Sequence, residues 1–271
     1  MKKRDKLVIV VFSVFTLAAG FIGRAVDMVL TEQPEGQSLG MLIWLILPLL
    51  ISVIIRLTNK GYFEPVGFKM NFGRNAKIYA ISLLIFPLIS IVCTRTAYQF
   101  NQTIVGGFDR SLVGVVVAGA VLKNLVEEIT WRGNMVPFFE KTEWNDYLIY
   151  LSTGLIWGCW HIPYYLYFVG LDGDMKLKTI HSGIVIMLMW TPLFVEVRRA
   201  TRSFIPAYLL HMTEELSYSL IFVPAGKFKL NKTYDIFMNP VSGIIPLAFI
   251  LVLGLILRNR RVCRGEVLCQ E

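Results

Sequence analysis

The stretch LVGVVVAGAVLKNLVEEITWRG, residues 112–133, indicates the fold of this chain. Its first half is entirely apolar, and its second half holds two adjacent carboxylates, Glu127 and Glu128, followed by Arg132. An apolar run of this length is typical of a helix in a membrane, where an ionisable side chain is costly to bury. Carboxylates that persist in such a segment are by default a hypothesis about function.

The whole chain has the composition of a membrane protein. Of its 271 residues, 55% are hydrophobic and 17% are charged, whereas soluble domains average about 45–50% and about 25%. Apolar runs that could cross ~30 Å of hydrocarbon recur along the chain without the alternation of a membrane barrel. The sequence therefore predicts an all-α, polytopic membrane protein, a single transmembrane domain over residues 1–271. It predicts about eight transmembrane helices, at residues 7–23, 39–57, 77–97, 112–136, 147–169, 179–197, 203–223 and 240–257.

The basic residues predict the orientation of these helices. With the N-terminus inside, most Lys and Arg residues fall on the cytoplasmic side, so we expect both termini in the cytosol and localisation in the cell membrane of a prokaryote. A cleaved signal peptide ending near Gly20 would leave an odd number of spans, and we therefore expect an uncleaved anchor. The net charge of +8 implies no nucleic-acid partner, because the basic residues lie at membrane edges. Cys263 and Cys269 fall in a cytoplasmic tail, where thiols stay reduced.

Three of the predicted helices carry polar groups at similar depths. At a rise of 1.5 Å per residue, Glu127 lies ~15 Å, His161 ~21 Å and His211 ~12 Å from the cytoplasmic ends of their helices. A lone histidine in a membrane helix is more often an interhelical hydrogen-bond donor than a catalyst. The convergence of the three residues on one half of the bilayer is what favours a site.

The spacing suggests a role for each carboxylate. Glu128 and Arg132 are one helical turn apart and can pair, which leaves Glu127 to act as a base, although Lys123, one turn before Glu127, could pair with it instead. His211 and Glu215 also lie one turn apart, and a histidine near a carboxylate can activate water or donate to an oxyanion.

Other polar and aromatic residues receive structural interpretations. We interpret the aromatic residues around His161 as packing residues, namely Trp157, Trp160 and Tyr164. We interpret Glu196 as a solvated helix end.

Three motifs in this region resemble those of the CAAX protease and bacteriocin-processing family (CPBP, or Abi), a group of intramembrane glutamate endopeptidases. The first motif, E-E-x-x-x-R, lies at residues 127–132. The second, an aromatic residue followed four positions later by histidine, lies at 157–161. The third, a histidine followed four positions later by a polar residue, lies at 211–215. The resemblance covers roughly residues 115–220 and implies the eight-helix fold of that family.

The resemblance also implies roles for the residues. Glu127 would be the general base, working with His161 on an attacking water, while His211 and Glu215 would stabilise the oxyanion. Glu128 and Arg132 would hold the site together. The family implies a hydrolase that needs no metal and no other cofactor, in a cavity open to the cytosolic leaflet. Its partners would be membrane lipids and a peptide or lipidated-peptide substrate, such as a prenylated C-terminus or a bacteriocin leader.

One position departs from the family pattern. Residue 215 is Glu where the family usually has Asn or Asp, and an ionised carboxylate cannot donate a hydrogen bond. Glu215 would have to be protonated, act through water or only orient His211.

Three alternatives to an active, metal-independent protease stay open at this point. The chain could be a catalytically silent bacteriocin-immunity or scaffold protein, or a proton-coupled transporter. It could also be a metal-dependent protease with His161, His211 and either Glu127 or Glu215 as ligands.

Overall fold

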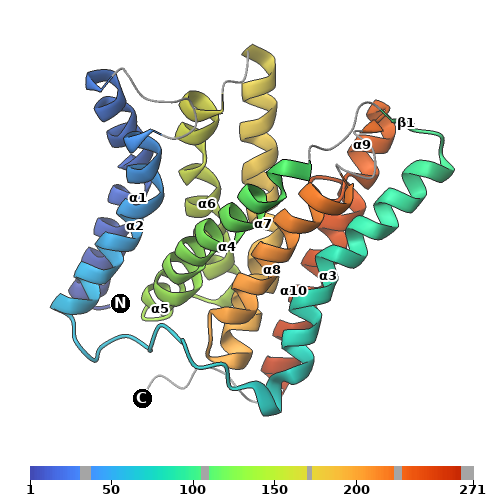
Figure 1. Ribbon diagram of the computed structural model, residues 1–271. Helices are drawn as coiled ribbons and strands as arrows, with labels where there is room; N and C mark the ends of the chain where they lie inside the picture. Colours follow the sequence, from blue (N-terminus) through green and yellow to red (C-terminus); the bar gives the residue numbers. More distant parts are fainter. Residues whose placement is uncertain (31–37, 105–109, 170–172, 223–227, 264–271) are drawn as a thin grey trace. The chain divides into compact units, whose positions relative to one another are not determined.

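The computed structural model describes residues 1–30, 38–104, 110–169, 173–222 and 228–263 (Figure 1). Over these residues the regular secondary structure is helical except for one pair of two-residue strands, which confirms the predicted all-α class. The helices are α1 (Lys3–Val29), α2 (Leu39–Thr58), α3 (Phe72–Gln99), α4 (Val113–Thr130), α5 (Val136–Phe139), α6 (Asp146–Trp160), α7 (Gly173–Thr201), α8 (Ile205–Ser217), α9 (Lys232–Met238) and α10 (Ile244–Cys263). A short 3₁₀-helix, η1 (Arg110–Leu112), precedes α4, and π-helices form η2 (Trp131–Met135), η3 (Tyr164–Phe168) and η4 (Tyr218–Phe222). The strands β1 (Thr103–Ile104) and β2 (Phe228–Lys229) pair antiparallel.

Within the described residues, four helices are long and apolar enough to cross a membrane: α1, α2, α7 and residues Asn75–Gln99 of α3. They coincide with the predicted spans 7–23, 39–57, 77–97 and 179–197, and they indicate a multi-pass membrane protein. The other four predicted spans coincide with helices that are shorter or more charged: α4 carries Lys123 and the glutamate pair, α6 and α8 have 15 and 13 residues, and α10 ends in basic residues. Those spans and the cytosolic placement of both termini stay predictions.

The chain divides into two compact units, each built from two separate segments. The first unit comprises residues 1–66 and 126–191, and the second comprises residues 67–125 and 192–271. Helices α4 and α7 contribute residues to both.

In the first unit, α1 and α2 lie side by side (Figure 1). Their backbones meet at two glycines, since a Cβ atom on Gly23 would lie 2.1 Å from the carbonyl oxygen of Gly40. Small residues of this kind allow membrane helices to approach closely. The next turn is fixed by Asp27, whose carboxylate accepts hydrogen bonds from the Gly40 amide at 2.8 Å and the Ser38 hydroxyl at 2.6 Å.

In the second unit, α3 packs against α8. The hydroxyl of Tyr234, on α9, donates to the carbonyl of Cys93, on α3, at 2.5 Å. Helix α10 packs closely on the last part of α7, because a Cβ atom on Gly254 would lie 2.4 Å from the amide nitrogen of Leu193.

Glu196, near the end of α7, corrects a prediction from the sequence. Its side chain is only 1% exposed and accepts hydrogen bonds from Arg199 at 2.8 Å and from both Nε and Nη2 of Arg261 at 2.8 and 3.1 Å. The interpretation of Glu196 as a solvated helix end was therefore wrong. Its second partner, Arg261, comes from α10, and residue spacing along the chain does not predict that pair. Cys263 has a free, exposed thiol, and Cys269 lies outside the described residues.

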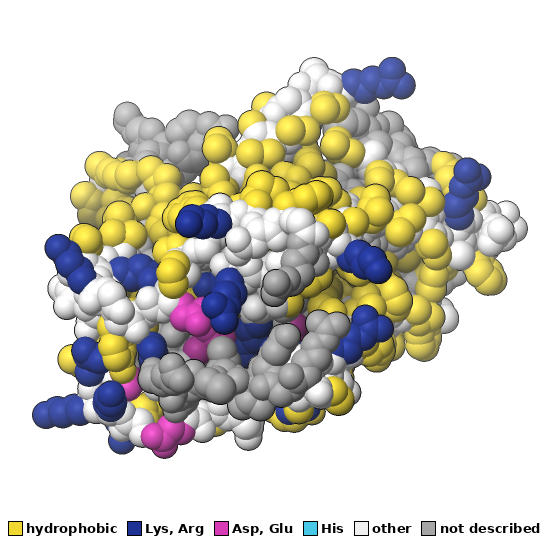
Figure 2. Space-filling view, turned by 90° about the horizontal axis from the view of Figure 1, so that it is seen from below, with side chains coloured by type: hydrophobic (Ala, Val, Ile, Leu, Met, Phe, Trp, Pro, Cys, Tyr) yellow, Lys and Arg dark blue, Asp and Glu magenta, His cyan; other side chains and the backbone are white. Residues whose placement is uncertain are grey.

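The outward faces of the long helices are strongly apolar. On α1, Leu7, Val10 and Val14 form one exposed stripe, whereas Val8 and Phe12 are buried. Figure 2 shows broad hydrophobic areas with scattered Lys and Arg side chains. Exposed apolar area of this extent is unusual for a soluble monomer and suits a lipid surrounding.

Candidate functional site

Glu127 is a buried carboxylate held by two tryptophans. Its side chain lies near the C-terminus of α4, and the residue is 2% exposed. One carboxylate oxygen, Oε2, accepts hydrogen bonds from the indole nitrogen of Trp131 at 3.2 Å and from that of Trp157 at 3.1 Å. Trp131 follows one turn later along the chain, and Trp157 comes from α6. The two indole N–H donors on one oxygen orient the carboxylate.

Glu128 and Arg132 form the ion pair that their spacing predicts. The two charged groups are 2.9 Å apart, and the residues are 0% and 2% exposed. The guanidinium carbon also lies 4.0 Å from the ring centre of Trp157, in a cation–π contact. A buried pair of this kind leaves no net charge, so it can hold the end of α4 against α6 within the first unit.

His161 lies just after α6, in the turn that precedes η3. Its Nδ1 is 2.9 Å from the carbonyl oxygen of Trp157. Because a carbonyl oxygen only accepts, Nδ1 carries the hydrogen, and a neutral ring then has its lone pair on Nε2. The ring is 8% exposed and lies between Trp160, edge-on at 4.8 Å, and Tyr165, stacked at 5.9 Å. These contacts fix the orientation of a histidine that can accept a proton at Nε2.

Trp157 makes more polar contacts than its position in the sequence predicted. Its indole N–H donates to Glu127, its ring faces Arg132 and its carbonyl accepts from His161. The interpretation as a packing residue is correct for its burial, at 0% exposure, but omits the polar contacts. The sequence held one usable signal, because a tryptophan one turn before His161 can direct its N–H toward a neighbouring helix.

His211 and Glu215 lie in the second unit, one turn apart on α8. His211 is 5% exposed and packs edge-on against Phe194 at 6.1 Å between ring centres. Glu215 forms an ion pair with Lys123 at 2.9 Å, and the side-chain amide of Asn124 donates to the same carboxylate oxygen at 2.9 Å. The structure thus places the predicted residues in two groups, Glu127, Glu128, Arg132 and His161 in the first unit and His211 and Glu215 in the second.

A π-helix follows each of the three motif-bearing helices. Helix η2 begins four residues after Glu127, η3 begins three after His161, and η4 begins three after Glu215. Isolated π-helical turns are rare and occur frequently at functional sites. Their repetition at the three motifs distinguishes these helices from α1, α2 and α3.

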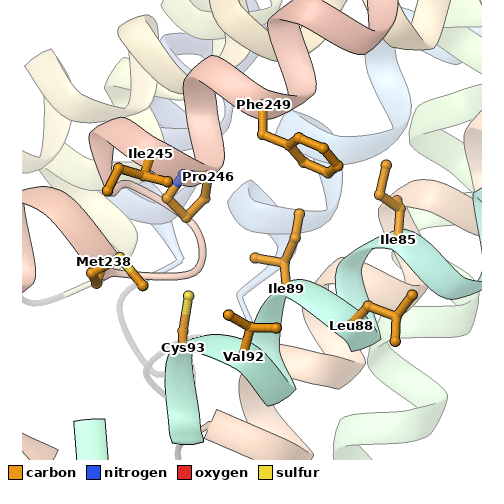
Figure 3. A pocket seen from close by; sticks show the side chains of 9 residues that line it. All are labelled: Ile85, Leu88, Ile89, Val92, Cys93, Met238, Ile245, Pro246 and Phe249. Carbon is orange, nitrogen blue, oxygen red and sulfur yellow. The ribbon is translucent and has the colours of Figure 1, made fainter. Parts of the chain in front are cut away.

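The described residues contain no group of three or more His, Cys, Asp or Glu side chains that could hold a metal ion. A cavity of about 290 Å³ lies elsewhere in the second unit, between α3, α9 and α10 (Figure 3). Its lining is apolar, with Ile89, Met238 and Phe249 among its side chains, and it includes none of the predicted site residues.

Comparison with known protein families gives one match. The family model described as "Type II CAAX prenyl endopeptidase Rce1-like" matches residues 109–217. No curated protein sequence matches the chain. The matched segment begins just before α4 and ends with α8, so it contains all three motifs. Residues 109–217 are therefore similar to the Rce1-like CAAX prenyl endopeptidases, in agreement with the family resemblance of the three motifs.

Proposed function

We propose that this protein is a metal-independent intramembrane endopeptidase of the CAAX type. The observation that carries the proposal is the Glu127 carboxylate, buried among apolar helices and oriented by two indole N–H groups in the segment that matches the family. Glu127 accepts hydrogen bonds from the two indole N–H groups, whereas the neighbouring Glu128 forms a close ion pair with Arg132. The division of roles predicted from the sequence agrees with these contacts.

In the proposed reaction, Glu127 removes a proton from a water molecule that His161 helps to orient. The water oxygen forms a bond to the carbonyl carbon of the peptide, and the π electron pair moves onto the carbonyl oxygen. That negative charge is the one that His211 and its surroundings would stabilise. When the C–N bond breaks, the carbonyl re-forms and the leaving amine takes the proton held by Glu127.

The substrates that fit this proposal are peptides or lipidated peptides presented at the cytosolic leaflet. Prenylated C-terminal sequences and leader peptides of bacteriocins are the two classes that the family suggests. Both would approach from the membrane, consistent with the apolar outer surface of the protein.

The test is peptide cleavage by the purified protein in lipid vesicles. Peptides with and without a prenylated cysteine near the C-terminus would be offered, and products would be identified by mass spectrometry. Glu127→Gln should abolish turnover because the amide cannot accept the proton, and His161→Ala should reduce it strongly. Glu143→Gln is the matched control, since the Glu143 side chain is 75% exposed and forms an ion pair with the N-terminus. Unchanged turnover by Glu127→Gln would refute the proposal.

A catalytically silent immunity or scaffold protein is the second candidate. The observation that favours it is the ion pair of Glu215 with Lys123, because a paired carboxylate accepts hydrogen bonds and does not donate them. Protection of cells against a bacteriocin that survives Glu127→Gln would support this candidate.

A further inference from the structure

Trp44, on α2, and Trp160, on α6, bond to each other in both directions within the first unit. The indole N–H of Trp44 donates to the carbonyl of Trp160 at 2.9 Å, and the indole N–H of Trp160 donates to the carbonyl of Trp44 at 3.2 Å. The two rings stack at 4.0 Å between their centres, and both residues are buried. Trp44 lies outside residues 109–217, so neither the three motifs nor the family match includes it.

The backbone explains why each carbonyl takes an indole donor. In an α-helix the carbonyl of residue i accepts from the N–H of residue i+4, but four residues after Trp44 comes Pro48, which has no N–H. Trp160 is the last residue of α6, and regular helix bonding leaves the last carbonyls of a helix without a donor. Each indole thus supplies a donor where the other helix needs one, as buried polar groups require.

Trp44 also contacts both sides of the turn that carries His161. Its ring stacks on Trp160, one residue before His161, at 4.0 Å between ring centres and an interplanar angle of 13°. It stacks in the same way on Tyr164, three residues after His161, at 4.7 Å and 14°. The imidazole of His161 lies edge-on to Trp44 at 6.0 Å. One side chain of α2 therefore holds the residues on either side of His161.

The orientation of His161 depends on that turn. His161 is the first residue after α6, and its Nδ1 lies 2.9 Å from the carbonyl oxygen of Trp157. This bond keeps the ring hydrogen on Nδ1 and the lone pair on Nε2. A displacement of residues 160–164 would carry the ring away from the carbonyl and admit the other tautomer, with its hydrogen on Nε2.

We propose that Trp44 is a positioning residue for His161. By holding Trp160 and Tyr164, it keeps the imidazole in the orientation and the tautomer in which Nε2 can accept a proton. This inference rests on the proposed peptidase function, in which His161 helps to orient the attacking water. Trp44 acts through His161 and exchanges no proton itself.

The first test compares Trp44→Leu, Trp44→Phe and Trp144→Leu in the vesicle assay. A misplacement of about 1 Å can cost about 10²-fold in rate, so Trp44→Leu should lower kcat by roughly 10- to 100-fold while KM stays within about twofold. Trp44→Phe keeps a ring that can stack but has no N–H, so its kcat should lie between those of Trp44→Leu and the wild type. Trp144→Leu is the matched control, because Trp144 lies in the same unit and its ring packs on Phe139 at 5.5 Å; its kcat should equal that of the wild type.

The second test observes the ring of His161 by nitrogen NMR of protein labelled in its histidine rings. The chain has three histidines, and the signals of His161 are those missing from His161→Ala. In a neutral imidazole with its hydrogen fixed on one nitrogen the two nitrogens give well-separated signals, and exchange between the tautomers moves these signals toward each other. We expect separated His161 signals in the wild type and converging ones in Trp44→Leu, with the signals of the other two histidines unchanged.

The two readouts together separate positioning from structural support. A lower kcat with converging His161 signals supports the proposal. A wild-type kcat in Trp44→Leu overturns it, and so does a lower kcat with unchanged His161 signals, because the substitution would then act elsewhere in the protein. If Trp44→Leu does not fold, the same two readouts on Trp44→Phe, which keeps a stacking ring, decide between these outcomes.

Failure of this inference differs from failure of the proposed function. If the wild type cleaves peptide, Glu127→Gln does not, and Trp44→Leu keeps wild-type kcat, then the role of Trp44 is refuted and the peptidase function stands. If the wild type cleaves no peptide, the proposed function is wrong and the role of Trp44 in catalysis falls with it.

Discussion

Replacement of Arg132 by methionine tests the ion pair that supports the candidate site. Arg132 and Glu128 are 2% and 0% exposed and 2.9 Å apart, and the guanidinium faces the ring of Trp157 at 4.0 Å. Methionine keeps much of the side-chain volume but removes the charge. Glu128 would then lie among apolar side chains without the cation that it contacts.

The expected destabilisation follows from these contacts. Breaking a buried ion pair by removing one partner costs about 3–5 kcal/mol, and loss of a cation–π contact adds about 0.5–2 kcal/mol. For a chain of this size each kcal/mol lowers Tm by about 2–4 °C. We therefore expect Arg132→Met to lower Tm by at least ~7 °C. Glu128→Leu combined with Arg132→Met should restore most of this loss, because replacement of both partners by apolar residues is often neutral.

The assay is thermal unfolding in detergent, followed by intrinsic tryptophan fluorescence. Arg95→Met is the matched control, since Arg95 is exposed on α3 and surface substitutions usually change stability by about 0.5 kcal/mol or less. The expected decrease in Tm is at least ~7 °C. A Tm for Arg132→Met within about 2 °C of that control would therefore refute the reasoning. So would a double variant no more stable than Arg132→Met, because the two residues would then not be coupled.

Further predictions concern helix packing, a second ion pair and metals. Gly20→Ala should destabilise the protein and reduce turnover, because a Cβ atom there would lie 2.4 Å from the Cβ atom of Pro163, just after His161; the control Gly119→Ala, with open space around it, should stabilise by up to ~1 kcal/mol. Glu196→Gln should speed proteolysis of α10, since it removes the charge that Arg261 contacts through two nitrogens; an unchanged digestion rate would contradict this. Turnover should be unaffected by a strong chelator, and a loss that added zinc restores would instead revive the metal-dependent alternative.

The features that sequence predicted well are those set by composition or by local spacing. The apolar runs give the all-α class and four helices long enough to span a membrane, because hydrocarbon requires a helix of known length. The Glu128–Arg132 pair was predictable because residues one turn apart on a helix are neighbours whatever surrounds them.

The features that sequence did not predict depend on contacts between helices. Glu215 pairs with Lys123, and Glu196 with Arg261, across long sequence separations. These pairs form where helices pack against each other, and residue spacing does not predict which helices are neighbours. The three π-helices were missed for a related reason, because their i→i+5 hydrogen bonds leave no recognisable apolar period in segments this short.

The two residues that depart from the expected motifs both have polar partners in the structure. At position 157 the chain has Trp where the family more often has Phe, and the added N–H donates to the buried carboxylate of Glu127. At position 215 it has Glu where the family usually has Asn or Asp, and the added charge is matched by Lys123 and Asn124. A buried polar group without a partner is costly, so a polar side chain at either position is expected to have such partners for stability alone. Both departures therefore have polar partners in the structure, Trp157 in Glu127 and Glu215 in Lys123 and Asn124, and measured turnover decides whether the site is active.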